Sequence, residues 1–124
     1  MAKFLSNIDK GALKNYKEIY SSPTISTGQL TLDLSNGNVF NVSLNASITI
    51  MTISNIPSSS FAANFTLIFT ADGTARGVAW APSIKWPNGT APTLTSTNGK
   101  RDAFTFVTLD GGTTWLGFVG GQNF

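Results

Sequence analysis

The stretch LTLDLSNGNVFNVSL, from Leu30 to Leu44, indicates β structure because apolar and polar residues alternate on both sides of a turn signal. In each half, the apolar residues fall on one face of an extended strand. The residues predicted to point inward are Leu30, Leu32, Leu34, Phe40, Val42 and Leu44. Between the halves, Asn36-Gly37 is a two-residue turn sequence that is typical of hairpins. The stretch therefore predicts two strands joined as a hairpin.

Further short strands are predicted up to the end of the chain. SITIMTIS and NFTLIFT have strand composition, and RDAFTFVTL and TTWLGFVG predict a last hairpin around the turn DGG. Pro82, Pro87 and Pro92 divide the region between them into short edge strands and turns. Eight or nine short strands without an internal helix predict an all-β fold, an antiparallel β-sandwich or barrel. A jelly roll is the favoured form.

The C-terminal strand raises the question of a subunit contact. We expect Trp115 to be buried, and Phe124 to seat in a neighbouring subunit. Gly117 and the pair Gly120-Gly121 would permit close backbone approach at a sheet edge or at a subunit interface. The stretch is therefore interpreted as a structural element rather than as a binding site.

The N-terminal segment has a different pattern. Over residues 4–20, apolar residues recur at three- and four-residue spacing, which predicts a short helix. SSPTISTG, residues 21–28, predicts an extended linker, with Pro23 ending the helix. Residues 1–27 are thus predicted to form a helical or extended arm with its linker, and residues 28–124 a β domain. Two alternatives stay open for the helix: it packs on its own body, or it docks on another molecule.

Charge is scarce and unevenly placed. Charged residues make up 11% of the 124-residue chain, whose net charge is +2. Residues 1–20 hold four lysines and two carboxylates, whereas residues 21–124 hold four cationic and four acidic side chains. The arm therefore carries the whole excess, and the body lacks the basic face of a nucleic-acid-binding protein. With no signal-peptide core and no membrane span in the sequence, we expect a soluble protein made in a cytoplasm, without a membrane partner.

The inventory of reactive groups is small. The chain has no Cys and no His, so disulfides, thiolate metal sites and the commonest general base are excluded. Asp72 and Asp110 precede Gly in turn sequences, Asp33 falls on the outward face of a strand, and Asp102 is expected in a solvated cluster beside Lys100 and Arg101. We therefore expect neither catalytic residues nor a metal or cofactor site.

The tryptophans are the remaining candidates for a binding site. Trp80, Trp86 and Trp115 can stack on sugar rings, with Asn88 and Thr90 supplying hydrogen bonds. The alternative is that Trp80 and Trp86 cover the open end of the sandwich and that Trp115 packs in it. Buried aromatic residues are common in small β cores, so the sequence leaves both readings open.

The stretches GQLTLDLSNGNVFNVSL and IKWPNGTAPTLTSTNGKRDAFTFVTLDGGTTWLGFVGGQNF resemble a β-sandwich module of tailed-bacteriophage virion proteins. Such modules occur in capsid decoration proteins and in the distal domains of fibres, and the resemblance covers roughly residues 27–124. It implies a structural virion component, commonly a homotrimer, with no catalytic residues to carry over. The long shaft of a fibre protein is missing from the part of the chain before the module.

These expectations combine into a decoration (cement or head-fibre) protein on the capsid surface. The arm would bind the major capsid protein through apolar residues, and its lysines would pair with an acidic capsid surface. The predicted anchoring residues are Phe4, Leu5, Ile8, Leu13, Tyr16 and Ile19. The alternative is a tail-fibre or receptor-binding tip that contacts host glycan through Trp80, Trp86 and Asn88. An isolated carbohydrate-binding module is the third reading.

Overall fold

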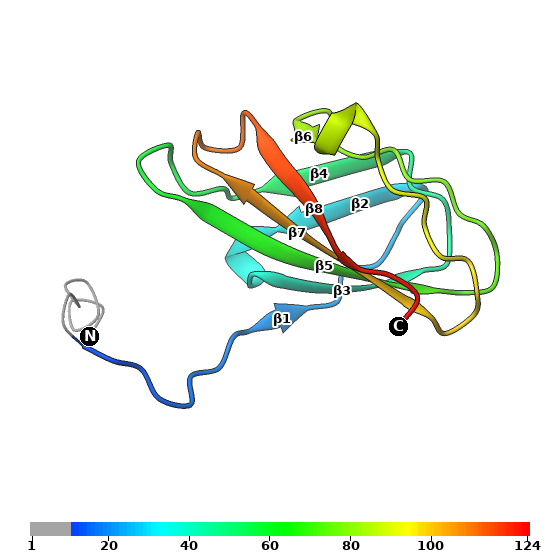
Figure 1. Ribbon diagram of the computed structural model, residues 1–124, viewed down its shortest axis with the longest axis horizontal. Coiled ribbons are helices and arrows are strands. Elements are labelled where there is room, and N and C mark those ends of the chain that lie inside the picture. The colour runs from blue at the N-terminus through cyan, green and yellow to red at the C-terminus, as the bar shows by residue number, and fades with distance from the viewer. Residues whose placement is uncertain (1–10) are drawn as a thin grey trace.

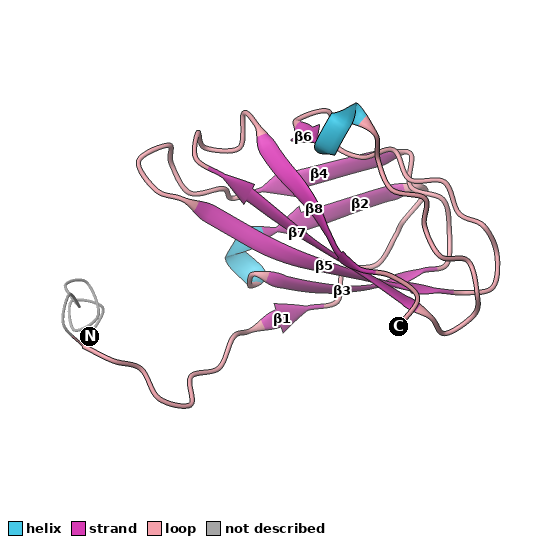
Figure 2. Ribbon diagram, viewed as in Figure 1, coloured by secondary structure: helices cyan, strands magenta, loops and turns pink. Residues whose placement is uncertain are grey.

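The computed structural model describes residues 11–124, and strands dominate it (Figures 1 and 2). The strands are β1 (Tyr20–Ser21), β2 (Gln29–Asp33), β3 (Val39–Leu44), β4 (Ile50–Ser54), β5 (Ala63–Ala71), β6 (Ile84–Lys85), β7 (Arg101–Thr108) and β8 (Trp115–Gly121). Two single-turn 3-10 helices, η2 (Leu34–Asn36) and η3 (Pro87–Gly89), are the helical elements of this range. The predicted all-β class is confirmed.

The strands form two sheets that enclose the core. The larger sheet has the order β1-β3-β5-β7-β8-β6, and the smaller one pairs β2 with β4. Pairing is antiparallel between β5, β7 and β8, but parallel in β1/β3, β3/β5, β2/β4 and β6/β8. The predicted last hairpin, β7 with β8, is confirmed, whereas antiparallel pairing throughout is wrong. A jelly roll, which consists of antiparallel sheets, is not confirmed.

The parallel pairs β1/β3, β3/β5 and β2/β4 arise because the chain alternates between the sheets from β1 to β5. Strands β1, β3 and β5 lie side by side in the large sheet, and β2 and β4 pair in the small one. The hairpin predicted at Asn36-Gly37 is therefore wrong, since β2 and β3 belong to different sheets. Asn36 ends the turn η2, and Gly37 (φ 130°, ψ 174°) directs the chain across to the other sheet.

The core lies between the sheets and is rich in phenylalanine. The ring of Phe65 packs on Phe106 with centroids 4.7 Å apart, and on Trp115 at 5.0 Å. The other inward side chains with less than 3% exposure include Leu30, Leu32, Phe40, Val42, Leu44, Ile48, Leu67, Phe69 and Phe104. Each such side chain contributes about 1.5–3 kcal/mol through burial. Of the predicted inward residues, Leu34 alone is only half-buried, because it belongs to η2 rather than to a strand.

The N-terminal arm is extended over its described part. Residues 11–19 belong to no helix or strand and are all exposed, and Figure 1 shows them leading away from the body. The predicted helix over 4–20 is therefore wrong for 11–20, while residues 1–10 lie outside the described part. Asn15 has a φ of 52°, which a right-handed helix does not accommodate. Tyr20 pairs with Val39, so the sheet begins within the segment predicted to be arm and linker.

Candidate interaction site

Three of the four body carboxylates act in turns. Asp33, Asp72 and Asp110 each accept hydrogen bonds that lower their pKa. The principal donors are the side chain of Asn55 for Asp33 (2.7 Å), Arg76 for Asp72 (2.5 Å) and the backbone N–H of Thr114 for Asp110 (2.9 Å). A general acid needs a raised pKa, so these groups are suited to holding turns rather than to proton transfer. Among residues 11–124, no three His, Cys, Asp or Glu side chains lie close enough to hold a metal ion.

The prediction for the fourth carboxylate, Asp102, is wrong. Asp102 is 2% exposed and does not form a solvated cluster with its cationic neighbours. It accepts hydrogen bonds from the backbone N–H of Thr95 (2.7 Å), the backbone N–H of Asn123 (3.0 Å) and the side chain of Gln122 (3.1 Å). Burial by itself raises the pKa of Asp102, but these hydrogen bonds outweigh it and the pKa is lowered. Asp102 thus joins β7 to two flanking segments.

The three tryptophans cover or fill the core. Trp115 is fully buried, as predicted. Trp80 and Trp86 are half-buried, lie edge to face with centroids 4.9 Å apart, and pack on Phe104 and Phe106. The Nε1 atoms of Trp86 and Trp115 are buried and have no acceptor within the described residues. Trp80 and Trp86 therefore cover the core, which was one of the two readings of the sequence.

The predicted binding of glycan depends on the surface beside the rings of Trp80 and Trp86. Asn88 is exposed in η3, two residues beyond Trp86, where it adopts a left-handed φ of 57°. Next to this turn lies a hollow of about 180 Å³, lined by Lys85, Trp86, Pro87, Leu116, Gly117 and Phe118. Contact of glycan with Trp80, Trp86 and Asn88 stays a prediction.

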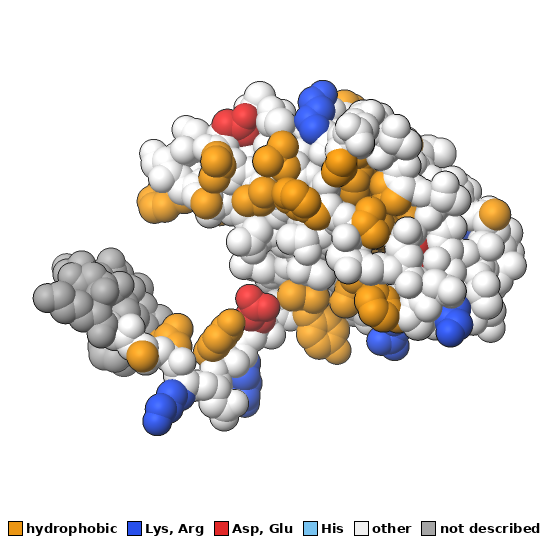
Figure 3. Space-filling view, in the orientation of Figure 1, with side chains coloured by type: hydrophobic (Ala, Val, Ile, Leu, Met, Phe, Trp, Pro, Cys, Tyr) orange, Lys and Arg blue, Asp and Glu red, His pale blue; other side chains and the backbone are white. Residues whose placement is uncertain are grey.

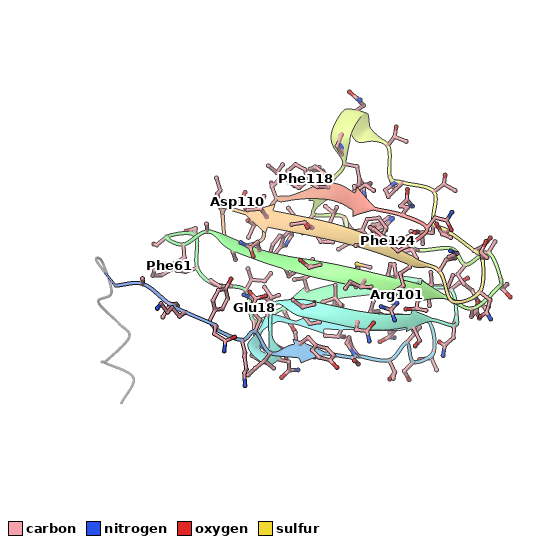
Figure 4. All side chains as sticks on the ribbon, turned by 60° about the horizontal axis from the view of Figure 1, so that its bottom comes forward. Glu18, Phe61, Arg101, Asp110, Phe118 and Phe124 are labelled. Atoms are coloured by element: carbon pink, nitrogen blue, oxygen red, sulfur yellow. The ribbon has the colours of Figure 1, made fainter. Side chains whose placement is uncertain are left out.

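An apolar stripe runs along the outer face of the large sheet at β8. Leu116 and Phe118 point outward, opposite the buried Trp115, and are 48% and 47% exposed. Phe124 lies against Gly121 on the same face and is 67% exposed. We call Leu116, Phe118 and Phe124 the β8 stripe. Figure 3 shows hydrophobic side chains gathered along β8, and Figure 4 labels Phe118 and Phe124 over this part of the sheet.

The glycines of β8 do permit close approach, but to groups of the same chain. A Cβ on Gly117 would lie 3.0 Å from ring carbons of Trp86, and one on Gly121 would overlap the ring of Phe124. Gly120 lies close to the carbonyl of Ala103 on β7. The space beside these glycines is therefore filled within the chain. The expected contact of Phe124 with a neighbouring subunit stays a prediction. One side of its ring already packs on Gly121, so such a contact would use the other side.

The arm presents its apolar residues to solvent. Leu13, Tyr16 and Ile19 are 68%, 69% and 76% exposed, while the other predicted anchoring residues, Phe4, Leu5 and Ile8, lie outside the described part. The arm leaves the body at a fixed point, because β1 pairs with β3 and the carbonyl of Ile19 lies against Gly37. Figure 4 shows Glu18 at this point. In the strand order, β1 is one edge of the large sheet and the two-residue strand β6 is the other, with β8 next to it.

Comparisons of the chain with protein-family models, with curated proteins and with solved structures each gave no match. None of the helices in residues 11–124 is long and apolar enough to cross a membrane. The resemblance to virion modules therefore stays a prediction from the sequence stretches.

Proposed function

We propose that this chain is a structural virion protein of a tailed bacteriophage. It is a trimeric capsid decoration protein of the cement or head-fibre type, made in the host cytoplasm and attached to the major capsid protein by its N-terminal arm. The observation that carries this proposal is the arm itself. It leaves the body extended, with Leu13, Tyr16 and Ile19 more than two-thirds exposed. An apolar segment in this state buries its side chains only by binding another surface.

The charge distribution supports the same role. The excess positive charge of the chain lies in residues 1–20, and the body is neutral. Lys14 and Lys17 are exposed among the apolar residues of the arm, so they are available to pair with acidic groups of a capsid. Such exposed pairs are weakened by salt. Several arms in one trimer multiply the attachment, because each bound arm holds the others near their sites.

The body supplies durability rather than chemistry. Its carboxylates hold turns or, in the case of Asp102, tie segments together within the core. Its core is a continuous cluster of aromatic and aliphatic side chains from both sheets. This composition is suited to a surface protein that stabilises an assembly, and it leaves the arm as the attachment element.

Decoration of phage heads tests the proposal. Heads that lack the protein are mixed with the purified full chain or with the variant F4S/L5S/I8S, and bound protein is measured after sedimentation. We expect the variant to lose at least tenfold in apparent affinity, and the wild-type protein to bind less at high salt. Phe61→Ser, at an exposed loop of the body, is the matched control and should bind normally. Binding of the arm variant at wild-type affinity would contradict attachment by the arm.

The structure shows how much of the N-terminal arm can be removed without removing a strand of the body. Removal of residues 1–27 would also remove β1, which belongs to the large sheet. A truncation that ends at residue 18 leaves this pairing intact. Loss of decoration by this shorter truncation then reports on the arm as a whole, including any contact of its residues with a neighbouring copy, rather than on a damaged body.

The second candidate function is a tail-fibre or receptor-binding tip that recognises host glycan. The hollow beside Trp86 favours it, because its lining includes two aromatic residues, Trp86 and Phe118, and Lys85 for polar contact. Trp86→Ala is a poor test, since Trp86 packs on Phe104 and Phe106. Phe118→Ala changes the hollow from its exposed side. Loss of phage adsorption with an unchanged melting temperature would support the glycan reading, and normal adsorption would remove it.

A further inference from the structure

We propose that residues 11–19 of one copy bind along the β8 stripe of a second copy, so that copies of the chain associate head to tail. The inference rests on the proposed function in one respect, the trimer. It goes beyond that function by naming the two surfaces that meet. The β8 stripe of one copy is thus covered by residues 11–19 of another copy, a segment that does not pack on its own body.

The arm has the properties of a ligand for an apolar surface. All its residues from 11 to 19 are exposed, and Leu13, Tyr16 and Ile19 are its large apolar side chains. When the arm is extended, Leu13 and Ile19 share one face and can meet an apolar surface together. Its exit from the body is fixed by the pairing of Tyr20 with Val39. Because residues 11–19 lead away from the body, they are directed toward a neighbouring molecule rather than toward their own β8.

The β8 stripe has the properties of an acceptor. Leu116, Phe118 and Phe124 are uncharged side chains, flanked by Lys85 beside Leu116 and by Arg101 beside Phe124. Phe118 also borders the hollow beside Trp86. The three side chains together expose roughly 300 Å², a little over a third of the roughly 800 Å² that each partner contributes to a standard interface. The rest of that area is available from the edge of β8 and from body surfaces that the arm brings together.

Length and position agree with this pairing. Residues 11–19 reach at most about 30 Å when extended, and the seven residues of β8 run for roughly 23 Å. The arm is therefore long enough to lie along the whole of β8. The arm leaves at the β1 edge of the large sheet, whereas the stripe lies at the opposite side. The β1 edge of one copy thus meets the β8 side of the next when copies stand edge to edge.

Both surfaces have charges of either sign beside them, and Arg101 adds a cation next to Phe124. Glu18 is the carboxylate of the described arm, and Lys85 is the charged residue that lines the hollow. At the β7–β8 turn, Asp110 is exposed and available to the arm residues Lys14 and Lys17. Within residues 11–124 the single ion pair joins Arg76 to Asp72, so these charges have no ionic partner in that range.

A contact between two different surfaces has a consequence for symmetry. Head-to-tail contacts close into a ring when the rotation between copies allows it, and three copies form the smallest ring larger than a pair. A stripe that met the same stripe of a second copy would give a two-fold dimer instead. This inference changes one part of the proposed function: Leu13, Tyr16 and Ile19 hold the neighbouring copy instead of the capsid. Phe4, Leu5 and Ile8 are left as the anchoring residues for the capsid.

Two full-length variants test the arm and the β8 stripe separately. The arm variant L13D/Y16D keeps the stripe, and the stripe variant Phe118→Asp keeps the arm. Both changes are at exposed side chains, and circular dichroism with thermal unfolding checks that each variant is folded. In light scattering on a sizing column, we expect the wild-type protein near three chain masses of 13.1 kDa each, and each variant alone near one. Phe61→Asp, the matched control on the body, should stay at three.

The mixture of the two variants is the decisive sample. The intact arm of the stripe variant can bind the intact stripe of the arm variant, but neither remaining surface can continue the ring. We therefore expect a one-to-one complex of two chains across a concentration series, and nothing larger. The assay uses no capsid, so failure of decoration and failure of this inference are seen in different experiments.

Four outcomes would overturn the inference. A trimeric arm variant would show that the arm has no part in self-association. An arm variant that stays oligomeric while the stripe variant is monomeric would indicate stripe-to-stripe contact. Two monomeric variants that do not combine when mixed would exclude the arm as the occupant of the stripe. A wild-type protein that is monomeric throughout the series would leave the stripe to another partner, such as the capsid or a glycan.

Discussion

The carboxylate of Asp102 accepts a hydrogen bond from the backbone N–H of Asn123 at 3.0 Å, and this contact fixes the end of the chain beside β7. The other carboxylate oxygen accepts from the backbone N–H of Thr95 at 2.7 Å. Arg101 and Phe124 add a pair of backbone hydrogen bonds next to it. A single buried charge thus holds three segments, and it keeps the ring of Phe124 in place on the outer face of the sheet.

Removal of this carboxylate is expected to destabilise the fold. Asp102→Ala leaves the N–H groups of Thr95 and Asn123 without the buried carboxylate that accepts from them, which costs about 3 kcal/mol. Asp102→Asn keeps the shape but turns an amide donor toward one of these N–H groups, so it is also destabilising. Urea unfolding measures both losses, and hydrogen exchange at Asn123 reports the release of the chain end. Arg101→Ala, at the exposed neighbouring position, is the control, and an Asp102→Ala protein as stable as this control would contradict the role.

The stability of the fold should fall in acid, and Asp102 contributes to the fall. Its pKa is lowered in the folded protein, although burial alone would raise it, because hydrogen bonds favour the charged form. A group with a depressed folded-state pKa stabilises the fold above its unfolded pKa of about 3.9 and loses that contribution as the pH falls further. The difference in unfolding free energy between wild type and Asp102→Asn should therefore be largest above pH ~4 and shrink below it. Urea titrations at several pH values check this. A difference that is constant with pH would show that Asp102 does not titrate with folding.

The sequence was informative about faces of strands. Alternation placed Leu30, Leu32, Phe40 and Val42 in the core, where the structure has them. The same alternation carried the signal for Asp102, which is in phase with Phe104 and Phe106 on β7. Its neighbours Lys100 and Arg101 suggested a solvated cluster. The prediction for Asp102 followed this local charge pattern instead of the alternation of buried and exposed residues along the strand. A polar residue in phase with a buried strand face is better read as a buried hydrogen-bond centre.

Sheet pairing could not be predicted from the same pattern. An amphipathic strand buries one face equally well when the next strand pairs with it or lies opposite it across the core. Asn36-Gly37 suited both arrangements, because Gly37 adopts a positive φ in the crossing turn as it would in a hairpin. The predicted helix of the arm failed for a related reason: a short amphipathic helix needs a surface to pack on. The exposed β8 stripe was likewise not predicted from the sequence, because its residues lie beside buried apolar residues in the same part of the chain.

Gly37 is expected to control the position of the arm. Its backbone lies in a region that is essentially restricted to glycine, and a Cβ there would overlap the carbonyl of Ile19. Gly37→Ala therefore strains the crossing turn by about 1–3 kcal/mol or detaches β1, which pairs through only two residues. Limited proteolysis should cut residues 11–22 faster in this variant, and light scattering should show weaker self-association. Gly99→Ala, also at a positive φ but with open space around it, is the control for backbone strain alone. Equal proteolysis of the two variants would contradict a role for Gly37 in holding β1.

The contact between Gly117 and Trp86 is expected to set the shape of the hollow. A Cβ on Gly117 lies 3.0 Å from ring carbons Cε3 and Cζ3 of Trp86, so Gly117→Ala pushes against a ring that is already packed on Phe104 and Phe106. Overpacking of this kind costs about 1–3 kcal/mol. Thermal unfolding measures the loss, and tryptophan fluorescence reports the displaced ring. Gly77→Ala has an ordinary backbone conformation and its Cβ would meet only Ser47 Oγ at 3.9 Å, which makes it the neutral comparison. If Gly117→Ala matched this comparison in both measurements, the ring of Trp86 would have room to move away from β8, and the hollow would be an adaptable surface rather than a fixed one.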